Sequence, residues 1–290
     1  MPEDRDPNAP VSGWTPPPRP EFDALEGRWA RIERLDAHIN AVVVTDFDRA
    51  LERARTLTDT GFAADQPLFG VPMTIKESFD VEGLPTCWGH QAYADNIAKA
   101  DARVVSLLKG AGAVILGKTN VPPDLADWQS RNPVYGRTNN PHDAGRSPGG
   151  SSGGAAAAVA SGMVACDFGT DIGGSVRVPA HFCGIWGHKS SWGLVPLQGH
   201  VHPQLAGRNA HDGALGIAGP LARNAADLRL LVELTRSLAD LAYDLGSDSD
   251  TLRRHMVSIQ SVDRITQAQL ASDLVGRLQI GLQRSLFDVT

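Results

Sequence analysis

A glycine-rich stretch near the middle of the chain, residues 145–193, constrains the fold more than any other segment. It contains 12 of the 30 glycines in the 290-residue sequence. Glycine adopts backbone angles that other residues avoid, and it lets other groups approach the main chain closely. Two corners stand out within the stretch, GGSSGG at residues 149–154 and GGS at residues 173–175. Their composition is typical of a backbone built around something small, and their serines are the first candidates for a chemical site.

Helical and extended patterns alternate along much of the chain. Segments with helical apolar spacing start at residues 28, 47 and 101, and extended apolar segments cover residues 40–45, 70–76 and 113–116. Further helices are expected at residues 154–160, 178–188 and 224–238, the last with Asn224 as its N-cap. This alternation predicts an α/β fold with a central sheet that helices cover on both faces.

The extended segment at residues 70–76 ends in a lysine. Alternation places Val71 and Ile75 on one side of this strand, and Thr74 and Lys76 on the other. Burial disfavours the charged form of a lysine, so a neutral amine at this strand end can accept a proton. Alone, Lys76 would be interpreted as a surface charge. Its place in the sequence GVPMTIKESFD makes it a candidate base.

The segments GGSSGG, GTDIGGSVRVP and GHK follow the lysine strand in an order that resembles the amidase signature family of serine hydrolases, over residues 28–236. The resemblance implies a nucleophile at Ser175, and a proton relay that passes through Ser151, held by a cis peptide bond, to Lys76. The implied oxyanion hole consists of the backbone N–H groups of Ile172, Gly173, Gly174 and Ser175. The implied supporting residues are Ser152, which hydrogen-bonds behind the relay, and the ion pair of Asp171 and Arg177.

The family implies hydrolysis of a linear carboxylic amide to an acid and ammonia or an amine, through a seryl acyl-enzyme. It also implies a central mixed β-sheet between layers of α-helices, and chemistry that needs no metal and no organic cofactor. Two alternatives remain open. One is the glutamine-hydrolysing subunit of a transfer-RNA amidotransferase, and the other is a shortened, catalytically inactive homologue.

The two ends of the chain differ from its middle. Residues 1–20 are rich in proline without periodicity, which predicts a flexible arm. We expect residues 21–290 to form a single domain, with the motif core at residues 70–236 and a weakly matching part at residues 239–290. A leucine stripe in that last part predicts a long helix followed by the start of a strand. We therefore expect much of the family's C-terminal half to be missing.

Composition narrows the possible partners. Hydrophobic residues make up 42% and charged residues 21% of the chain, the formal net charge is -6, and no basic run is present. These values favour a small-molecule amide as the partner and disfavour direct nucleic-acid binding or a membrane span. The three cysteines form no CxxC pair, which predicts buried thiols in a reducing cytoplasm. We expect a monomer or a homodimer.

Two other patterns suggest different chemistry. Residues 112–119 match the P-loop pattern GxxxxGK[ST], but residues 113–116 form a predicted buried strand and two prolines follow at residues 122–123. This context predicts that the segment binds no nucleotide. His200 and His202 could form a metal pair, but no third ligand lies at a suitable spacing in the sequence, so both are interpreted as loop histidines.

Overall fold

A computed structural model describes residues 22–61, 66–206 and 215–236, which all belong to one compact unit within residues 1–236. Its α-helices are α1 (Phe22–Ile39), α2 (Phe47–Thr60), α3 (Arg103–Gly110), α4 (Gly153–Ala160), α5 (Arg177–Cys183) and α6 (Ala225–Thr235). Its main strands are β1 (Val42–Thr45), β2 (Pro72–Lys76), β3 (Val114–Thr119), β6 (Cys166–Asp171), β7 (Trp186–Gly187) and β8 (Ile217–Ala222). Shorter elements are the pair β4 (Arg131–Asn132) and β5 (Gly136–Arg137), and the 3₁₀ turns η2 (Gln91–Tyr93), η3 (Pro123–Leu125) and η4 (Pro203–Leu205).

The six main strands form one mixed sheet in the order β1-β3-β2-β6-β8-β7. The central strand β2 runs parallel to both of its neighbours, pairing Lys76 with Thr119 of β3 and Thr74 with Asp167 of β6. The strands β1, β8 and β7 add to this core in antiparallel pairings. Central strands lie under helices on both faces, so β2 and β6 carry buried side chains along most of their length.

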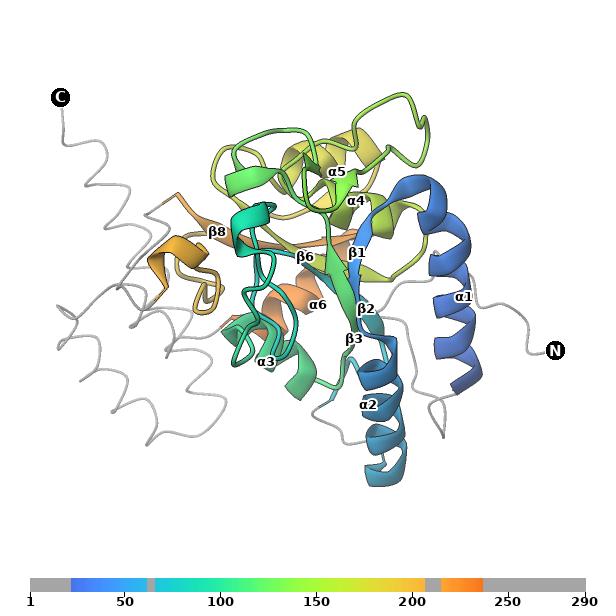
Figure 1. The fold of residues 1–290 in the computed structure, drawn as a ribbon. Helices are drawn as coiled ribbons and strands as arrows, with labels where there is room; N and C mark the ends of the chain where they lie inside the picture. Colours follow the sequence, from blue (N-terminus) through green and yellow to red (C-terminus); the bar gives the residue numbers. More distant parts are fainter. Residues whose placement is uncertain (1–21, 62–65, 207–214, 237–290) are drawn as a thin grey trace, which may run out of the picture. The chain divides into compact units, whose positions relative to one another are not determined.

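Helices cover both faces of the sheet, as the sequence predicts (Figure 1). The helices α4 and α5 lie on one face, and α3 and α6 lie on the other. Each face has its own apolar core. One core joins α3 and α6 to the sheet through Val105, Leu108 and Leu231. The other joins α1, α2 and α4 to β3 through Ile32, Leu57 and Val159. The predicted α/β sandwich is therefore confirmed.

Most predicted elements are present, and two are shorter than expected. The helix predicted for residues 178–188 is α5, which ends at Cys183 because Gly184 adopts the left-handed conformation (φ 68°, ψ 35°). The chain then enters β7, which pairs with β8. The helix predicted for residues 224–238 is α6, which ends at Thr235, and the side chain of Asn224 caps it by accepting from the N–H of Asp227.

The predicted strand at residues 113–116 is longer than expected and continues through Gly117, Lys118 and Thr119 as β3. These residues of the P-loop pattern therefore lie in a buried strand, and their amides cannot cradle a phosphate. All three cysteines are free and buried, as predicted. The predicted N-terminal arm and the predicted helix and strand after residue 239 lie outside the described residues.

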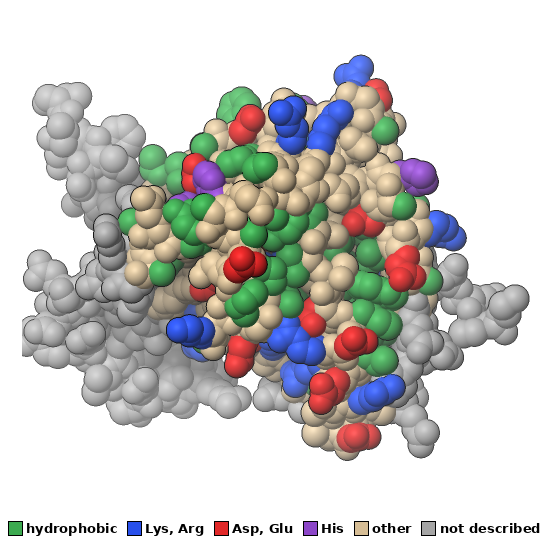
Figure 2. All heavy atoms as spheres, in the orientation of Figure 1, with side chains coloured by type: hydrophobic (Ala, Val, Ile, Leu, Met, Phe, Trp, Pro, Cys, Tyr) green, Lys and Arg blue, Asp and Glu red, His purple; other side chains and the backbone are tan. Residues whose placement is uncertain are grey.

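The surface carries charges of both signs. On the face drawn in Figure 2, acidic and basic side chains are interspersed among apolar and uncharged polar groups. This face therefore lacks a single-sign field of the kind that steers polyanions. Within the described ranges, no helix combines the length and the apolarity that crossing a bilayer requires.

Candidate active site

Lys76 lies at the C-terminal end of β2, and its side chain is fully buried. Its Nζ donates to Ser151 Oγ at 2.6 Å and to Thr170 Oγ1 at 2.9 Å, and it also lies 3.4 Å from the carbonyl oxygen of Thr170. Because β2 is held between β3 and β6, the backbone that carries the lysine is paired on both sides. The strand end therefore aims one amine at the first serine of the GGSSGG corner.

The GGSSGG corner fits only because glycine occupies its tightest positions. Gly149 has φ 85°, and a Cβ at Gly150 would lie 2.6 Å from the carbonyl oxygen of Asp127. The peptide bond between Gly150 and Ser151 is cis, in accordance with the resemblance. Ser151 is 1% exposed, and α4 begins two residues later. The corner thus buries a hydroxyl against the lysine amine.

The two glycine-rich corners are joined through their backbones. The N–H of Ser152 donates to the carbonyl oxygen of Ser175 at 3.0 Å. The hydroxyl of Ser152 lies 3.4 Å from the carbonyl oxygen of Thr170, so it supports the same strand end that Lys76 contacts. Ser175 is 9% exposed and precedes α5 by two residues. The structure thus brings Lys76, Ser151, Ser152 and Ser175 into one cluster.

The backbone around Ser175 offers hydrogen-bond donors. Among the described residues, no acceptor is hydrogen-bonded to the N–H groups of Ile172, Gly173 or Ser175. Gly174 differs, because its N–H donates to Asp171 Oδ1 at 2.8 Å. In this structure the N–H of Gly174 is therefore directed at a carboxylate, and the assignment of four oxyanion donors stays a prediction. Three of the expected donors are left for a ligand.

Asp171 and Arg177 form the expected ion pair, with Arg177 donating through Nε at 3.0 Å and through Nη2 at 2.9 Å. Lys189 adds a second cation, 3.2 Å from the same carboxylate. Burial raises the pKa of Asp171. The hydrogen bonds from Arg177 and from the N–H groups of Gly174 and Val176 outweigh this effect and hold the pKa well below its usual range. The ionised carboxylate therefore clamps the turn that precedes Ser175.

A second buried carboxylate lies under the lysine. Asp167 Oδ2 accepts from Thr74 Oγ1 at 2.6 Å and from Thr119 Oγ1 at 3.1 Å. Its Oδ1 has no hydrogen-bond partner within the described part of the chain. Burial raises the pKa of Asp167 to about 7, although the two threonine hydroxyls and the nearby charge of Lys76 act in the opposite direction. The charge of this carboxyl thus changes near neutral pH, next to the lysine.

Sequence reasoning missed three contributors to this cluster, Asp167, Thr170 and Lys189. An acidic residue inside a strand that is otherwise buried, CDFGTD, is a signal that could have identified Asp167. Thr170 and Lys189 lie within the segments GTDIGGSVRVP and GHK, but their contacts could not be read from these motifs because they depend on which strands are neighbours. The side chain of Trp128 lies within 4 Å of the position that a Cβ at Gly174 would occupy. Its 56% exposed side chain therefore flanks the turn that carries Ser175.

A sequence model of the Amidase family matches residues 23–250. A glutamyl-tRNA(Gln) amidotransferase subunit of Aromatoleum aromaticum is 40% identical over 258 residues, which are 89% of this chain and 49% of the relative. Fatty-acid amide hydrolase 2 of Homo sapiens is 40% identical over 223 residues, which are 73% of this chain and 41% of the relative. The chain therefore belongs to the amidase signature family.

A solved structure agrees with this assignment. A bacterial aryl acylamidase described as an amidase signature enzyme superposes with a TM-score of 0.68 at 31% identity, covering 76% of this chain and 44% of that one. The chain thus spans about half the length of the curated relatives it matches. The residues that the family model matches include Lys76, Ser151 and Ser175.

Proposed function

We propose that this chain carries the catalytic centre of an amide hydrolase, with Ser175 as the nucleophile, Ser151 as the proton relay and Lys76 as the base. The observation that carries the proposal is the 2.6 Å hydrogen bond between the buried amine of Lys76 and the hydroxyl of Ser151. The residue after Ser151 in the same corner, Ser152, donates its backbone N–H to the carbonyl oxygen of Ser175. The proposal thus needs no histidine: the base is hydrogen-bonded to the relay, and the nucleophile lies on the turn whose backbone accepts from the residue after the relay.

The first half of the reaction forms an acyl-enzyme. Lys76, as the neutral amine, accepts the proton of Ser151, while Ser151 accepts the proton of Ser175. The oxygen of Ser175 attacks the amide carbonyl carbon, and the carbonyl electron pair moves onto oxygen. In the proposed step, the N–H groups of Ile172, Gly173 and Ser175, which have no backbone acceptor among the described residues, donate to that oxyanion. The C–N bond then breaks, and the relay returns its proton to the leaving nitrogen.

The second half of the reaction uses the same relay in the opposite role. Water loses a proton through Ser151 to Lys76 and attacks the acyl carbon, and the bond to the oxygen of Ser175 breaks. Ser175 regains its proton from the relay, and the carboxylic acid leaves. Asp171 and Arg177 do not exchange protons in this scheme, because their ion pair holds the turn that carries Ser175.

We propose linear carboxylic amides as the substrate class. Relatives of equal identity carry names as different as a fatty-acid amide hydrolase and an amidotransferase subunit, so similarity alone selects no acyl group. Exposed apolar side chains at Trp128 and Ile172 flank the turn of Ser175 and favour an apolar substituent beside the carbonyl carbon.

The test is intact-mass analysis of the purified chain after treatment with a fluorophosphonate, which reacts with activated serines. We expect one adduct on the unmodified chain and none on Ser175→Ala. Ser151→Ala and Lys76→Ala should slow the labelling of Ser175, because each removes one step of the proton relay. A folded chain without an adduct would contradict the proposal and would support a catalytically inactive homologue.

A further inference from the structure

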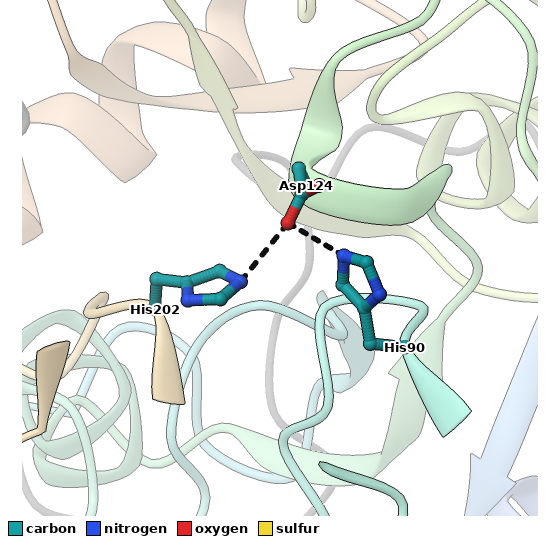
Figure 3. A group of neighbouring side chains, drawn as sticks. All are labelled: His90, Asp124 and His202. Carbon is teal, nitrogen blue, oxygen red and sulfur yellow. Dashed lines mark hydrogen bonds and ion pairs between the residues drawn. The ribbon is translucent and has the colours of Figure 1, made fainter. Parts of the chain in front are cut away.

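Three side chains outside the serine cluster converge on one point of the surface (Figure 3). The Nε2 atom of His90 lies 2.6 Å from Asp124 Oδ1, and the Nε2 atom of His202 lies 3.0 Å from the same oxygen. The three potential ligand atoms all lie within 4.8 Å of one another. The other two potential ligands, His90 and Asp124, therefore come from two segments that lie far from His202 in the sequence.

His200 does not belong to this group. It is buried and contacts Ser78 Oγ through its Nε2 at 3.0 Å. Residues 200 and 202 therefore have different surroundings although only one residue separates them. His200 and His202 therefore do not form a pair with each other, because the chain directs these two rings to different partners.

Aromatic contacts hold the two imidazole rings of the cluster. The ring of His202 packs edge-on against Trp88 and Tyr93, with distances between ring centroids of 5.2 and 5.4 Å. The centroid of the His90 ring lies 5.9 Å from that of Tyr93. Asp124 has φ 55° and ψ 11°, a left-handed conformation that aspartate tolerates better than most residues. The three groups are thus presented by ordered backbone and by packed rings.

The donor set selects a class of ion. Two imidazole nitrogens with one carboxylate oxygen suit Zn²⁺ and similar transition metals, whereas Mg²⁺ and Ca²⁺ prefer all-oxygen sites. Ligands 2.0–2.1 Å from a tetrahedral Zn²⁺ lie about 3.3 Å apart. The Nε2 atoms of His90 and His202 now lie 2.6 and 3.0 Å from Asp124 Oδ1. Each of these two distances must increase by less than about 1 Å for the ion to fit.

We propose that His90, Asp124 and His202 bind a divalent transition-metal ion, with Zn²⁺ as the reference case, at a site separate from the serine, relay and base. The exposed fractions of these side chains, 35%, 54% and 17%, allow an ion to enter and water to complete its coordination. The ion replaces the N–H···O bonds of both rings by metal–nitrogen bonds, so Nε2 of each ring must lose its proton.

One further bond changes when the ion binds. The Nδ1 atom of His202 accepts from the N–H of Gln204 at 3.2 Å, so the free ring carries its proton on Nε2. Coordination through Nε2 moves that proton to Nδ1, which can then no longer accept. We therefore expect η4 to rearrange on binding, and the N–H of Gln204 provides a local reporter for nuclear magnetic resonance.

The ion would join three loops, one of which leads to the serine cluster. Asp124 lies in η3, and the chain continues from there to Asp127, whose carbonyl oxygen is near Gly150, and to Trp128, which flanks Gly174. A bound ion would therefore link the segment from Asp124 to Trp128, which lies near both glycine corners, to residues 90 and 202. Binding is expected to stabilise the folded protein, because the loops of the unfolded chain hold no preformed site.

The test is isothermal titration calorimetry, in which Zn²⁺ is added to the chelator-treated chain. The chain carries no affinity tag. We expect about one ion per chain, and a loss of affinity of roughly tenfold or more in Asp124→Asn and His202→Gln. Asparagine suits the left-handed backbone of residue 124, so that variant should fold. His181→Gln, an exposed histidine of α5 outside the cluster, is the matched control and should bind like the unmodified chain.

Thermal unfolding provides the second measurement. Zn²⁺ should raise the midpoint of the unmodified chain and of His181→Gln, but not that of Asp124→Asn. The proposal is overturned if the unmodified chain binds no ion, or if Asp124→Asn and His202→Gln bind as tightly as it does. If neither variant folds, Co²⁺ is added to the unmodified chain and the histidine ring protons are measured by nuclear magnetic resonance. Unshifted ring protons of His90 and His202 would refute coordination by these rings.

Discussion

Replacing Asp167 by asparagine should change how the stability of the protein depends on pH. In the folded protein, burial holds the pKa of this carboxyl near 7, compared with an ordinary value of 3.8. Between these two pH values, the folded chain binds more protons at this site than the unfolded chain. The free energy of unfolding therefore falls as pH rises through this window, and the loss is complete above about pH 7.

The magnitude follows from the two pKa values. Each pH unit between them changes the free energy of unfolding by about 1.4 kcal/mol, so raising the pH from 5 to 8 removes about 3 kcal/mol through this one group. Asparagine can keep the bonds from Thr74 and Thr119 by accepting through its oxygen. Its amide then takes the place of Oδ1, which has no partner within the described residues. The variant thus resembles the protonated carboxyl at every pH.

The assay is urea unfolding at pH 5, 6, 7 and 8, followed by far-ultraviolet circular dichroism. We expect Asp167→Asn to be more stable than the unmodified chain at pH 8, and the difference to shrink by about 3 kcal/mol at pH 5. Asp59→Asn, an exposed acid of α2, serves as the matched control and should follow the unmodified chain. Parallel pH dependences for Asp167→Asn and the unmodified chain would refute the assignment of a titrating carboxyl under Lys76.

Three further predictions concern stability and are measured by denaturant unfolding. Burial lowers the pKa of Lys118 to about 8, so the folded chain loses this proton at a lower pH than the unfolded chain, and the free energy of unfolding rises by roughly 2 kcal/mol between pH 8 and 10. Lys118→Met should abolish this rise. An unchanged dependence of the free energy of unfolding on pH would contradict the prediction. Gly154→Ala should destabilise the fold by about 3 kcal/mol or more, since its Cβ would lie 2.2 Å from the backbone nitrogen of Asn120, whereas Gly27→Ala, with nothing within 4 Å, should be tolerated. Asn224→Ala should cost about 1 kcal/mol through the lost cap of α6, and an unaltered midpoint would exclude that cap.

Local chemistry explains what the sequence predicted well. Helical and extended apolar spacing located α1, α2, α3 and the strands β1 and β2, because burial of one face repeats with a fixed period. The glycine corners were recognisable because no other residue fits their backbone angles and close contacts. The end of α5 was misplaced, since a single glycine in the left-handed region decides it and the pattern of apolar residues does not.

The arrangement of the strands decided the rest. The sequence alone determined that the chain carries two serine corners and a lysine strand, and it suggested their chemistry through the order of the motifs. Only the tertiary structure placed Asp167 and Thr170 beside Lys76, directed the N–H of Gly174 to Asp171, and brought His90 and His202 to Asp124. These contacts join residues far apart in the chain, or depend on the path of one turn. Their distances follow from strand order and loop packing, which no local pattern of residues encodes.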